Sequence, residues 1–116
     1  MTLVVIDTNM FLSCFELRID ILSQLREQYG ANSICTLDCV IDELKKEDKK
    51  YAFALKLAQS VLVHHYEGQA QTVDDAILDF AREKNAIIAS QDAELVKKAK
   101  NKHLKTIGIR QNKYLI

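Results

Sequence analysis

Short apolar runs alternate with longer amphipathic segments along the whole chain. A run rich in β-branched residues, such as Leu3 to Ile6, predicts a strand that is covered on both faces, because it offers no polar side to solvent. On the same reasoning, strands are expected at 3–6, 33–36, 61–64, 86–89 and 105–109.

Between the strands, apolar residues recur every three or four positions, which predicts helices with one buried face. Gly30 supplies a natural stop for the first helix, and the side chains of Asp38 and Thr72 are suited to begin two later ones. The C-terminal residues, 113–116, fit neither pattern. Helices are expected at 11–29, from Asp38 to Leu44, at 52–60, from Thr72 to Lys84, and at 93–100.

The regular alternation of strands and helices predicts the α/β class, as a three-layer α/β/α sandwich around a central parallel sheet of about five strands. The chain has 116 residues and shows neither a linker nor an internal repeat, so residues 1–116 are expected to form a single domain. In such sheets, ligand sites form beyond the carboxyl ends of the strands, near the point where strand order reverses.

Two acidic residues follow expected strands and are therefore candidates for such a site. Asp7 comes directly after the first strand, and Asp92 comes shortly after the fourth. Each also has a structural interpretation, because an Asp in this position often caps the helix that follows. The spacing alone leaves both interpretations open.

Other acids lie on expected helices. Glu43 falls at the edge of the apolar face formed by the second helix, whereas Asp42 points away from it. Asp74 and Asp75 open a later helix, where the helix dipole alone favours acidic residues. The helical wheel does not choose between these two, because periodicity is unreliable at a helix end.

If three or four of these acids converge, their charges need compensation, because clustered carboxylates raise one another's pKa values. Hard oxygen ligands suit Mg²⁺ or Mn²⁺ better than zinc. One or two such ions can polarise a phosphodiester, activate a water molecule and stabilise the leaving oxygen. The acids therefore indicate phosphodiesterase chemistry.

Four segments, taken together and in order, resemble the motifs of the PIN-domain nuclease family. The first looks like the opening strand and its DTN motif, and the second like the block in which an acid precedes Leu on a helix. The third looks like an Asp followed by small and apolar residues, and the fourth like a strand that ends in a polar pair and Asp. They are Val5–Asn9, Val40–Leu44, Thr72–Leu78 and Ile88–Leu95.

The resemblance implies roles for individual residues. Asp7, Glu43 and Asp92 would be metal ligands, either directly or through water. In the register of the family, Asp75 would complete the site in preference to Asp74, because Ala and Ile follow it directly. The polar side chains of Asn9 and Ser90 would hold the carboxylates or the water network in place, and Thr8 is a weaker candidate for the same role.

The resemblance also implies cleavage of single-stranded RNA that depends on Mg²⁺ or Mn²⁺, with one or two ions bound. Family habit implies a homodimer. One branch of the family consists of VapC-type toxins that pair with a small antitoxin, and another consists of ribosomal-RNA processing endonucleases of archaea and eukaryotes. The compact spacing between Glu43 and Asp75 looks closer to the second branch, and the sequence leaves the choice open.

The charge balance argues against a nucleic-acid partner, because Lys and Arg number 16 and so do Asp and Glu. If the acids are concentrated in one site, the lysines would make the rest of the surface positively charged. Bound cations would also offset the negative charge of the acids. Two lysine clusters could guide phosphates, although two solvated helix ends explain them equally well. The clusters lie within 45–50 and 97–102.

The remaining composition indicates a cytoplasmic protein with no membrane contact. No apolar run approaches the roughly 20 residues of a membrane helix, and the N-terminus does not resemble a signal peptide. Three cysteines without a CxxC pair indicate reduced thiols, and the histidines are too scattered to complete a zinc motif.

Two other classes of protein compete with the nuclease. A non-catalytic PIN-like module would keep the fold and bind RNA or protein, although the intact set of acids argues against it. A receiver domain would need two acids at the end of the first strand, and a haloacid-dehalogenase-type phosphatase would need an Asp where Asn9 stands.

Overall fold

Five parallel strands form the centre of the molecule in the computed structural model, which describes residues 2–110 and 114–115. The order of the strands across the sheet is β3-β2-β1-β4-β5. Because β1 lies in the middle, the chain first builds outward on one side through β2 and β3, and then on the other through β4 and β5. The strands are β1 (Val4–Ile6), β2 (Ile34–Leu37), β3 (Leu62–His64), β4 (Ile87–Ala89) and β5 (Thr106–Ile107).

The three central strands carry the core of the sheet. All side chains of β1, β2 and β4 are buried, as their β-branched and apolar composition predicts. Val4 pairs with Ile34 on one side and with Ile87 on the other, which fixes the register of the central three strands. The edge strand β3 is different, because Leu62 and Val63 remain 49% and 46% exposed.

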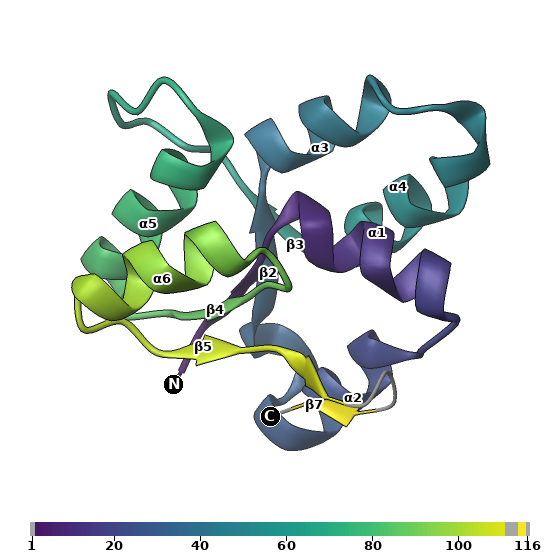
Figure 1. Cartoon of the computed structure of the whole chain (residues 1–116), viewed down its shortest axis with the longest axis horizontal. Coiled ribbons are helices and arrows are strands. Elements are labelled where there is room, and N and C mark those ends of the chain that lie inside the picture. Colours follow the sequence, from purple (N-terminus) through teal and green to yellow (C-terminus); the bar gives the residue numbers. More distant parts are fainter. Residues whose placement is uncertain (1, 111–113, 116) are drawn as a thin grey trace.

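Helices cover both faces of the sheet, as Figure 1 shows. One layer contains α1, α3 and α4, which contact one another, and the other contains α5 and α6. The α/β/α sandwich with a central parallel sheet of five strands is thereby confirmed. The helices are α1 (Thr8–Leu17), α2 (Ile21–Tyr29), α3 (Asp38–Lys45), α4 (Ala52–Gln59), α5 (Val73–Lys84) and α6 (Ala93–Asn101).

Four short elements complete the described part of the chain. Two are 3-10 turns that precede β2 and α4, and the other two are strands that pair antiparallel with each other outside the main sheet. They are η1 (Ala31–Ser33), η2 (Lys49–Tyr51), β6 (Ile109–Arg110) and β7 (Tyr114–Leu115). Of the unassigned tail at 113–116, residues 113 and 116 lie outside the described residues.

The single long helix expected at 11–29 is wrong, because the structure divides it into α1 and α2. Arg18 adopts a left-handed conformation with φ 55°, and its amide donates to the carbonyl oxygens of Cys14 and Phe15. Asp20 then begins α2 by accepting hydrogen bonds from the amide and hydroxyl of Ser23, at 3.1 and 2.7 Å. No Gly or Pro marks this break, and the signal that the pattern missed is the Asp cap.

Two smaller expectations are also corrected. Asp38 is the first residue of α3 rather than its cap, because its side chain turns outward to accept a hydrogen bond from the amide of Tyr66. The strand expected at 105–109 ends at Ile107, and Ile109 begins the separate strand β6. The amide of Ile109 donates instead to the side chain of Gln91.

Other expectations from the sequence are confirmed. Gly30 ends α2 with φ 92°, a conformation that glycine adopts without steric cost. Thr72 caps α5 by accepting a hydrogen bond from the amide of Asp75 at 3.1 Å. The three cysteines are free thiols. Within the described residues, no helix has both the length and the apolar character that crossing a membrane requires.

Candidate active site at the carboxyl edge of the sheet

The strand order places a reversal point between β1 and β4, which are neighbours in the sheet. The connections from β1 and from β4 lead to opposite sides of the sheet, so a crevice opens beyond their carboxyl ends. Asp7 follows β1 directly, and Ser90 follows β4. The two residues therefore meet at the place where open α/β sheets form ligand sites.

Asp7 is a buried carboxylate held by two hydrogen bonds. Its side chain is 2% exposed and caps α1, because Oδ1 accepts from the amide of Met10 at 2.8 Å. Its second oxygen, Oδ2, accepts from the hydroxyl of Ser90 at 2.5 Å. The capping interpretation is therefore confirmed: one oxygen of Asp7 caps α1, and the other accepts from the residue that follows β4.

The surroundings of Asp7 favour its neutral form. Burial is the largest effect and raises the pKa of Asp7 to about 7, against the hydrogen bonds from Ser90 and Met10, which lower it. The negative charges of Asp74 and Asp92 raise this pKa further. No described residue forms an ion pair with Asp7, so its carboxylate has no local positive partner.

Asp92 is joined to Asp7 through Ser90. The hydroxyl of Ser90, which donates to Asp7, accepts a hydrogen bond from the amide of Asp92 at 3.0 Å. Oδ1 of Asp92 caps α6 by accepting from the amides of Glu94 and Leu95. Its other oxygen, Oδ2, accepts no hydrogen bond from the described residues. Asp92, like Asp7, therefore uses one oxygen as a cap.

The structure distinguishes the two neighbouring acids at the start of α5. Asp74 is half-buried, and Asp75 is exposed. Partial burial is the largest effect that raises the pKa of Asp74, and the charges of Asp92 and Glu43 raise it further. Asp74 also contributes to the raised pKa of Asp7, whereas Asp75 lines a separate hollow farther along α5. Asp74 therefore interacts electrostatically with the other acids, whereas the resemblance to the family assigned this place to Asp75.

Glu43 reaches the group of acids from α3. It is half-buried at the edge of the apolar face, while Asp42 beside it is exposed, as the helical wheel predicts. Helices α3 and α5 contact each other across the carboxyl edge of the sheet. This contact explains why the charge of Glu43 is felt at Asp74.

Two polar side chains that follow Asp7 lack partners. Oγ1 of Thr8 and Oδ1 of Asn9 are buried, and neither forms a hydrogen bond with the described residues. A buried oxygen without a partner costs free energy comparable to a lost hydrogen bond, on the order of 1–3 kcal/mol. Both oxygens belong to residues that follow Asp7 directly in the chain and would suit a bound cation or an ordered water.

The chemistry of these side chains fits a hard divalent cation, because carboxylate and carboxamide oxygens are its preferred ligands. Their spacing does not form a ready site. Among the residues that the structure describes, no three His, Cys, Asp or Glu side chains lie close enough together to hold a metal ion. The described acids thus offer suitable donor atoms without a preformed cluster.

Lys98 is the basic residue that acts on this group. Its charge lowers the pKa of Asp74, against the effects of burial and of the neighbouring acids. The sequence showed Lys98 only as a member of a lysine cluster. Lys98 lies on α6, which packs beside α5 in the same layer. The sequence does not show how these two helices pack, so it does not show which lysine of the cluster lies near Asp74.

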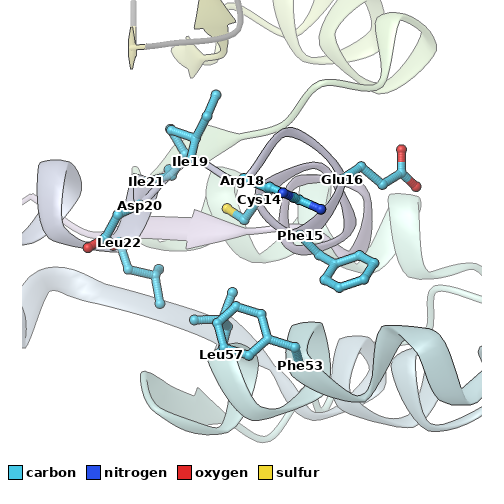
Figure 2. A pocket seen from close by; sticks show the side chains of 10 residues that line it. All are labelled: Cys14, Phe15, Glu16, Arg18, Ile19, Asp20, Ile21, Leu22, Phe53 and Leu57. Atoms are coloured by element: carbon cyan, nitrogen blue, oxygen red, sulfur yellow. The ribbon is translucent and has the colours of Figure 1, made fainter.

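A large hollow in the described structure is lined by residues other than the four candidate site acids. It has a volume of about 690 Å³ and lies between α1, α4 and the turn that joins α1 to α2. Figure 2 shows Phe53 and Leu57 of α4 facing Phe15 and Cys14 of α1 across it. Because its lining is mainly apolar and lacks clustered acids, this hollow does not offer the chemistry of the acidic site.

The sequence matches the model of the PIN-like domain family over residues 4–112. A comparison with curated proteins gives no match. Among solved structures, the chain is similar to the PIN domain endonuclease Utp24, with a TM-score of 0.82 and 24% identity. That likeness covers 97% of this chain and 89% of the other.

Two further structures share the fold. A domain of a functionally unknown protein from Methanocaldococcus jannaschii has a TM-score of 0.65 and 18% identity, covering 95% of this chain and 92% of that one. PAE2754 from Pyrobaculum aerophilum has a TM-score of 0.58 and 16% identity, covering 90% and 83%. These likenesses concern the fold, and the family model covers nearly the whole sequence. The chain therefore belongs to the PIN-like domain family.

Proposed function

We propose that this protein is a divalent-metal-dependent endoribonuclease that hydrolyses phosphodiester bonds in single-stranded RNA. The observation that carries the proposal is the environment of Asp7. A carboxylate that is 2% exposed, with its pKa raised to about 7 and other acids acting on it, is a group that a cation would stabilise. Perturbed acids of this kind are concentrated at functional sites.

We assign four acids to the metal site: Asp7, Glu43, Asp74 and Asp92. Asp74 takes the place that the family register gives to Asp75, because its charge acts on Asp7 and is acted on by Glu43. A bound Mg²⁺ or Mn²⁺ would polarise the scissile phosphate and lower the pKa of an attacking water. Titration of the protein with Mn²⁺ would measure whether one ion binds or two.

Other residues of the chain would prepare the site. The hydroxyl of Ser90 fixes the orientation of the Asp7 carboxylate, and the amide of Met10 holds its second oxygen. The buried Oδ1 of Asn9 has no partner among the described residues and would accept a hydrogen bond from water in the site. These contacts reduce the reorganisation that the carboxylates need when charge develops.

Cleavage of a labelled single-stranded RNA in Mn²⁺ or Mg²⁺ tests the proposal. We expect cleavage by the wild type, none in EDTA, and a loss of about 100-fold or more in the Asp7→Asn variant, since even residues that only support metal ligands contribute 10- to 100-fold. Cleavage that persists in EDTA, or in a folded Asp7→Asn variant, would contradict it.

The neighbouring acids of α5 provide a matched pair for the assignment. Asp74→Asn should abolish most cleavage, whereas Asp75→Asn should leave the rate within a few-fold of the wild type. Both changes remove one negative charge from the same helical turn, so a general charge effect would act on both alike. The opposite result would restore the family register and move the site toward Asp75.

A non-catalytic PIN-like module is the second candidate, and one observation favours it. The acids do not gather at metal-binding distance in the described structure. A module of this kind would bind RNA or a protein without cleaving it. Isothermal titration with Mn²⁺ distinguishes the two, because the module would show neither metal binding nor cleavage by well-folded protein.

The biological setting follows from the proposal only in part. An endonuclease role fits the likeness to the PIN domain endonuclease Utp24, and a toxin role would require an antitoxin partner. The homodimer, the antitoxin and the cytoplasmic location stay predictions. Mass measurement of the purified protein in solution tests the first of these directly.

A further inference from the structure

A second hollow lies beside the acidic site, on the side of α5 and α6. It has a volume of about 340 Å³, within the range of sites that bind small ligands. The segment between β3 and α5 forms one wall, the outer surface of α5 forms the floor, and the end of α6 closes it. The side chains that matter here are those of Tyr66, Gln69, Asp75, Asp79, Arg82 and Lys102.

The wall of this hollow is held by hydrogen bonds within the chain. The hydroxyl of Tyr66 donates to Oδ2 of Asp79 at 2.6 Å and accepts from the amide of Ala70 at 3.0 Å. Gly68 passes so close that a Cβ at this position would lie 2.1 Å from the Tyr66 hydroxyl oxygen. The amide of Tyr66 donates to Asp38 at 3.1 Å, which ties the wall to α3. The hollow therefore has its shape without a ligand.

The charges in the hollow are separated along the helices. Helices α5 and α6 both connect parallel strands, so both run from the carboxyl edge of the sheet, where the acids lie, toward the opposite edge. Arg82 lies about 10 Å farther along α5 than Asp75, at roughly 1.5 Å per residue. Lys102 lies at the end of α6. The cationic end of the hollow is thus the end away from the metal ligands that we assign.

The two cations are available to an anion. Arg82 and Lys102 are exposed, and neither forms an ion pair with a residue that the structure describes. Of the two acids in the hollow, Asp79 is already engaged by the hydroxyl of Tyr66. An Arg and a Lys that line one hollow without an ion-pair partner are suited to phosphate, which Arg binds through two parallel hydrogen bonds.

A second lysine connects the hollow to the acidic site. Lys98 acts electrostatically on Asp74, and Lys102 follows it by four residues, where it caps the carboxyl end of α6 and lines the hollow. A strand whose scissile phosphate lies at Asp74 and Asp92 would pass Lys98 before it reaches the hollow. The row of basic groups therefore begins at the site and ends in the hollow.

We propose that this hollow is a subsite for single-stranded RNA, in which Arg82 and Lys102 bind a backbone phosphate beyond Lys98, farther along the strand than the one that is cleaved. The proposal rests on the proposed nuclease function for its location, since it takes the acidic site as the place of cleavage. We expect the hollow to bind single strands, because a flexible backbone can follow a groove that a rigid duplex would not enter.

The test uses two double variants of the full chain. Arg82→Gln with Lys102→Gln removes both cations of the hollow, and Lys84→Gln with Lys100→Gln removes two exposed cations of the same helices outside it. Binding of an oligouridylate of about 8 nucleotides is measured by fluorescence anisotropy in EDTA, at several salt concentrations. The net charge of the two variants is equal, so non-specific attraction is matched.

We expect the hollow variant to bind at least 10-fold more weakly than the wild type. The slope of log affinity against log salt concentration should become shallower by about 0.7 for each phosphate that the variant no longer neutralises. The control variant should stay within about 2-fold of the wild type. Equal weakening in both variants, or no measurable binding by the wild type at low salt, would overturn the subsite.

The outcome separates the subsite from the nuclease. If the wild type cleaves RNA and the hollow variant binds and cleaves like the control, the nuclease stands and the subsite falls. If no metal supports cleavage and the hollow variant alone loses binding, the subsite stands and the nuclease falls. Because all four altered side chains are exposed, thermal unfolding should show both variants folded.

Discussion

Asp7 shows how one side chain serves both the fold and the candidate site. Its Oδ1 caps α1, and its Oδ2 binds the hydroxyl of Ser90 across the reversal point of the sheet. The capping role places the carboxylate at the positive end of a helix, and the covering layers bury it. The cap lowers the pKa of Asp7 and burial raises it, and burial has the larger effect.

Asp7→Asn should change how stability depends on pH when no divalent metal is present. The folded pKa is about 7 and the unfolded value is 3.8. Below about pH 4 both states hold the proton, and between about 4 and 7 only the folded state does, so stability falls as pH rises through this window. Denaturant unfolding in EDTA should show this fall in the wild type and a flatter profile in the variant.

The size of the effect is set by the same difference in pKa. Above pH 7 the Asn variant should be the more stable by about 4 kcal/mol, because each unit of difference in pKa corresponds to roughly 1.4 kcal/mol. Asp42→Asn, which removes an exposed carboxyl from α3, is the control and should keep the wild-type slope. Identical slopes for all three proteins would mean that Asp7 is ionised in the folded state throughout.

At the scale of elements, the ends of the helices carry the information that the apolar pattern lacks. Thr72 and Gly30 are visible in the sequence as a start and a stop, and both act as expected. Asp20 begins α2 in the same way, yet the apolar face continues through it and hides the break. Periodicity predicts which face of a helix is buried, and caps decide where the helix ends.

Thr72→Ala should destabilise the start of α5. It removes the hydroxyl that accepts from the amide of Asp75 at 3.1 Å. The loss should be about 1 kcal/mol in the free energy of unfolding, measured with denaturant. Thr72→Ser keeps the acceptor and should lose only a few tenths of that value; an equal loss in both variants would mean that the methyl group, rather than the cap, is what matters.

Arg18→Gly should stabilise the turn between α1 and α2. A non-glycine residue with φ 55° bears a steric cost of roughly 1–2 kcal/mol, which glycine avoids, although glycine loses more entropy on folding. The net gain should be up to about 1 kcal/mol in chemical denaturation. Lys56→Gly, in the interior of α4, is the opposite case and should cost about 1 kcal/mol. Destabilisation by both changes would show that Arg18 makes contacts worth more than its strain.

At the scale of the whole molecule, the sequence predicts the class of fold better than the details of the site. Alternation of buried strands with amphipathic helices is enough to predict the parallel sheet, and acids after β1 and β4 indicate its reversal point. The choice between Asp74 and Asp75 depends on how α5 packs against α3 and α6, which adjacent positions in one helical turn do not reveal. The same packing determines that Lys98 acts on the acids.

The candidate site joins parts of the chain that only the whole fold brings together. Asp7 and Asp92 cap α1 and α6, and Glu43 and Asp74 lie on α3 and α5. A cation that binds all four would bind the folded state and not the unfolded chain. It must then stabilise the fold by mass action, on the order of 2.7 kcal/mol at a concentration of about 100 times Kd.

Mn²⁺ should therefore raise the Tm of the wild type by roughly 5–15 °C at that excess, and EDTA should reverse the rise. Asp7→Asn should abolish most of the shift, because the buried carboxylate gains most from the ion, while Asp75→Asn should keep it. Differential scanning calorimetry across a range of Mn²⁺ concentrations measures all three proteins. An equal Tm shift in Asp7→Asn would show that the ion binds elsewhere on the surface. The clustering of mutually repelling acids would then need an explanation other than a metal ion that joins the two helical layers at the edge of the sheet.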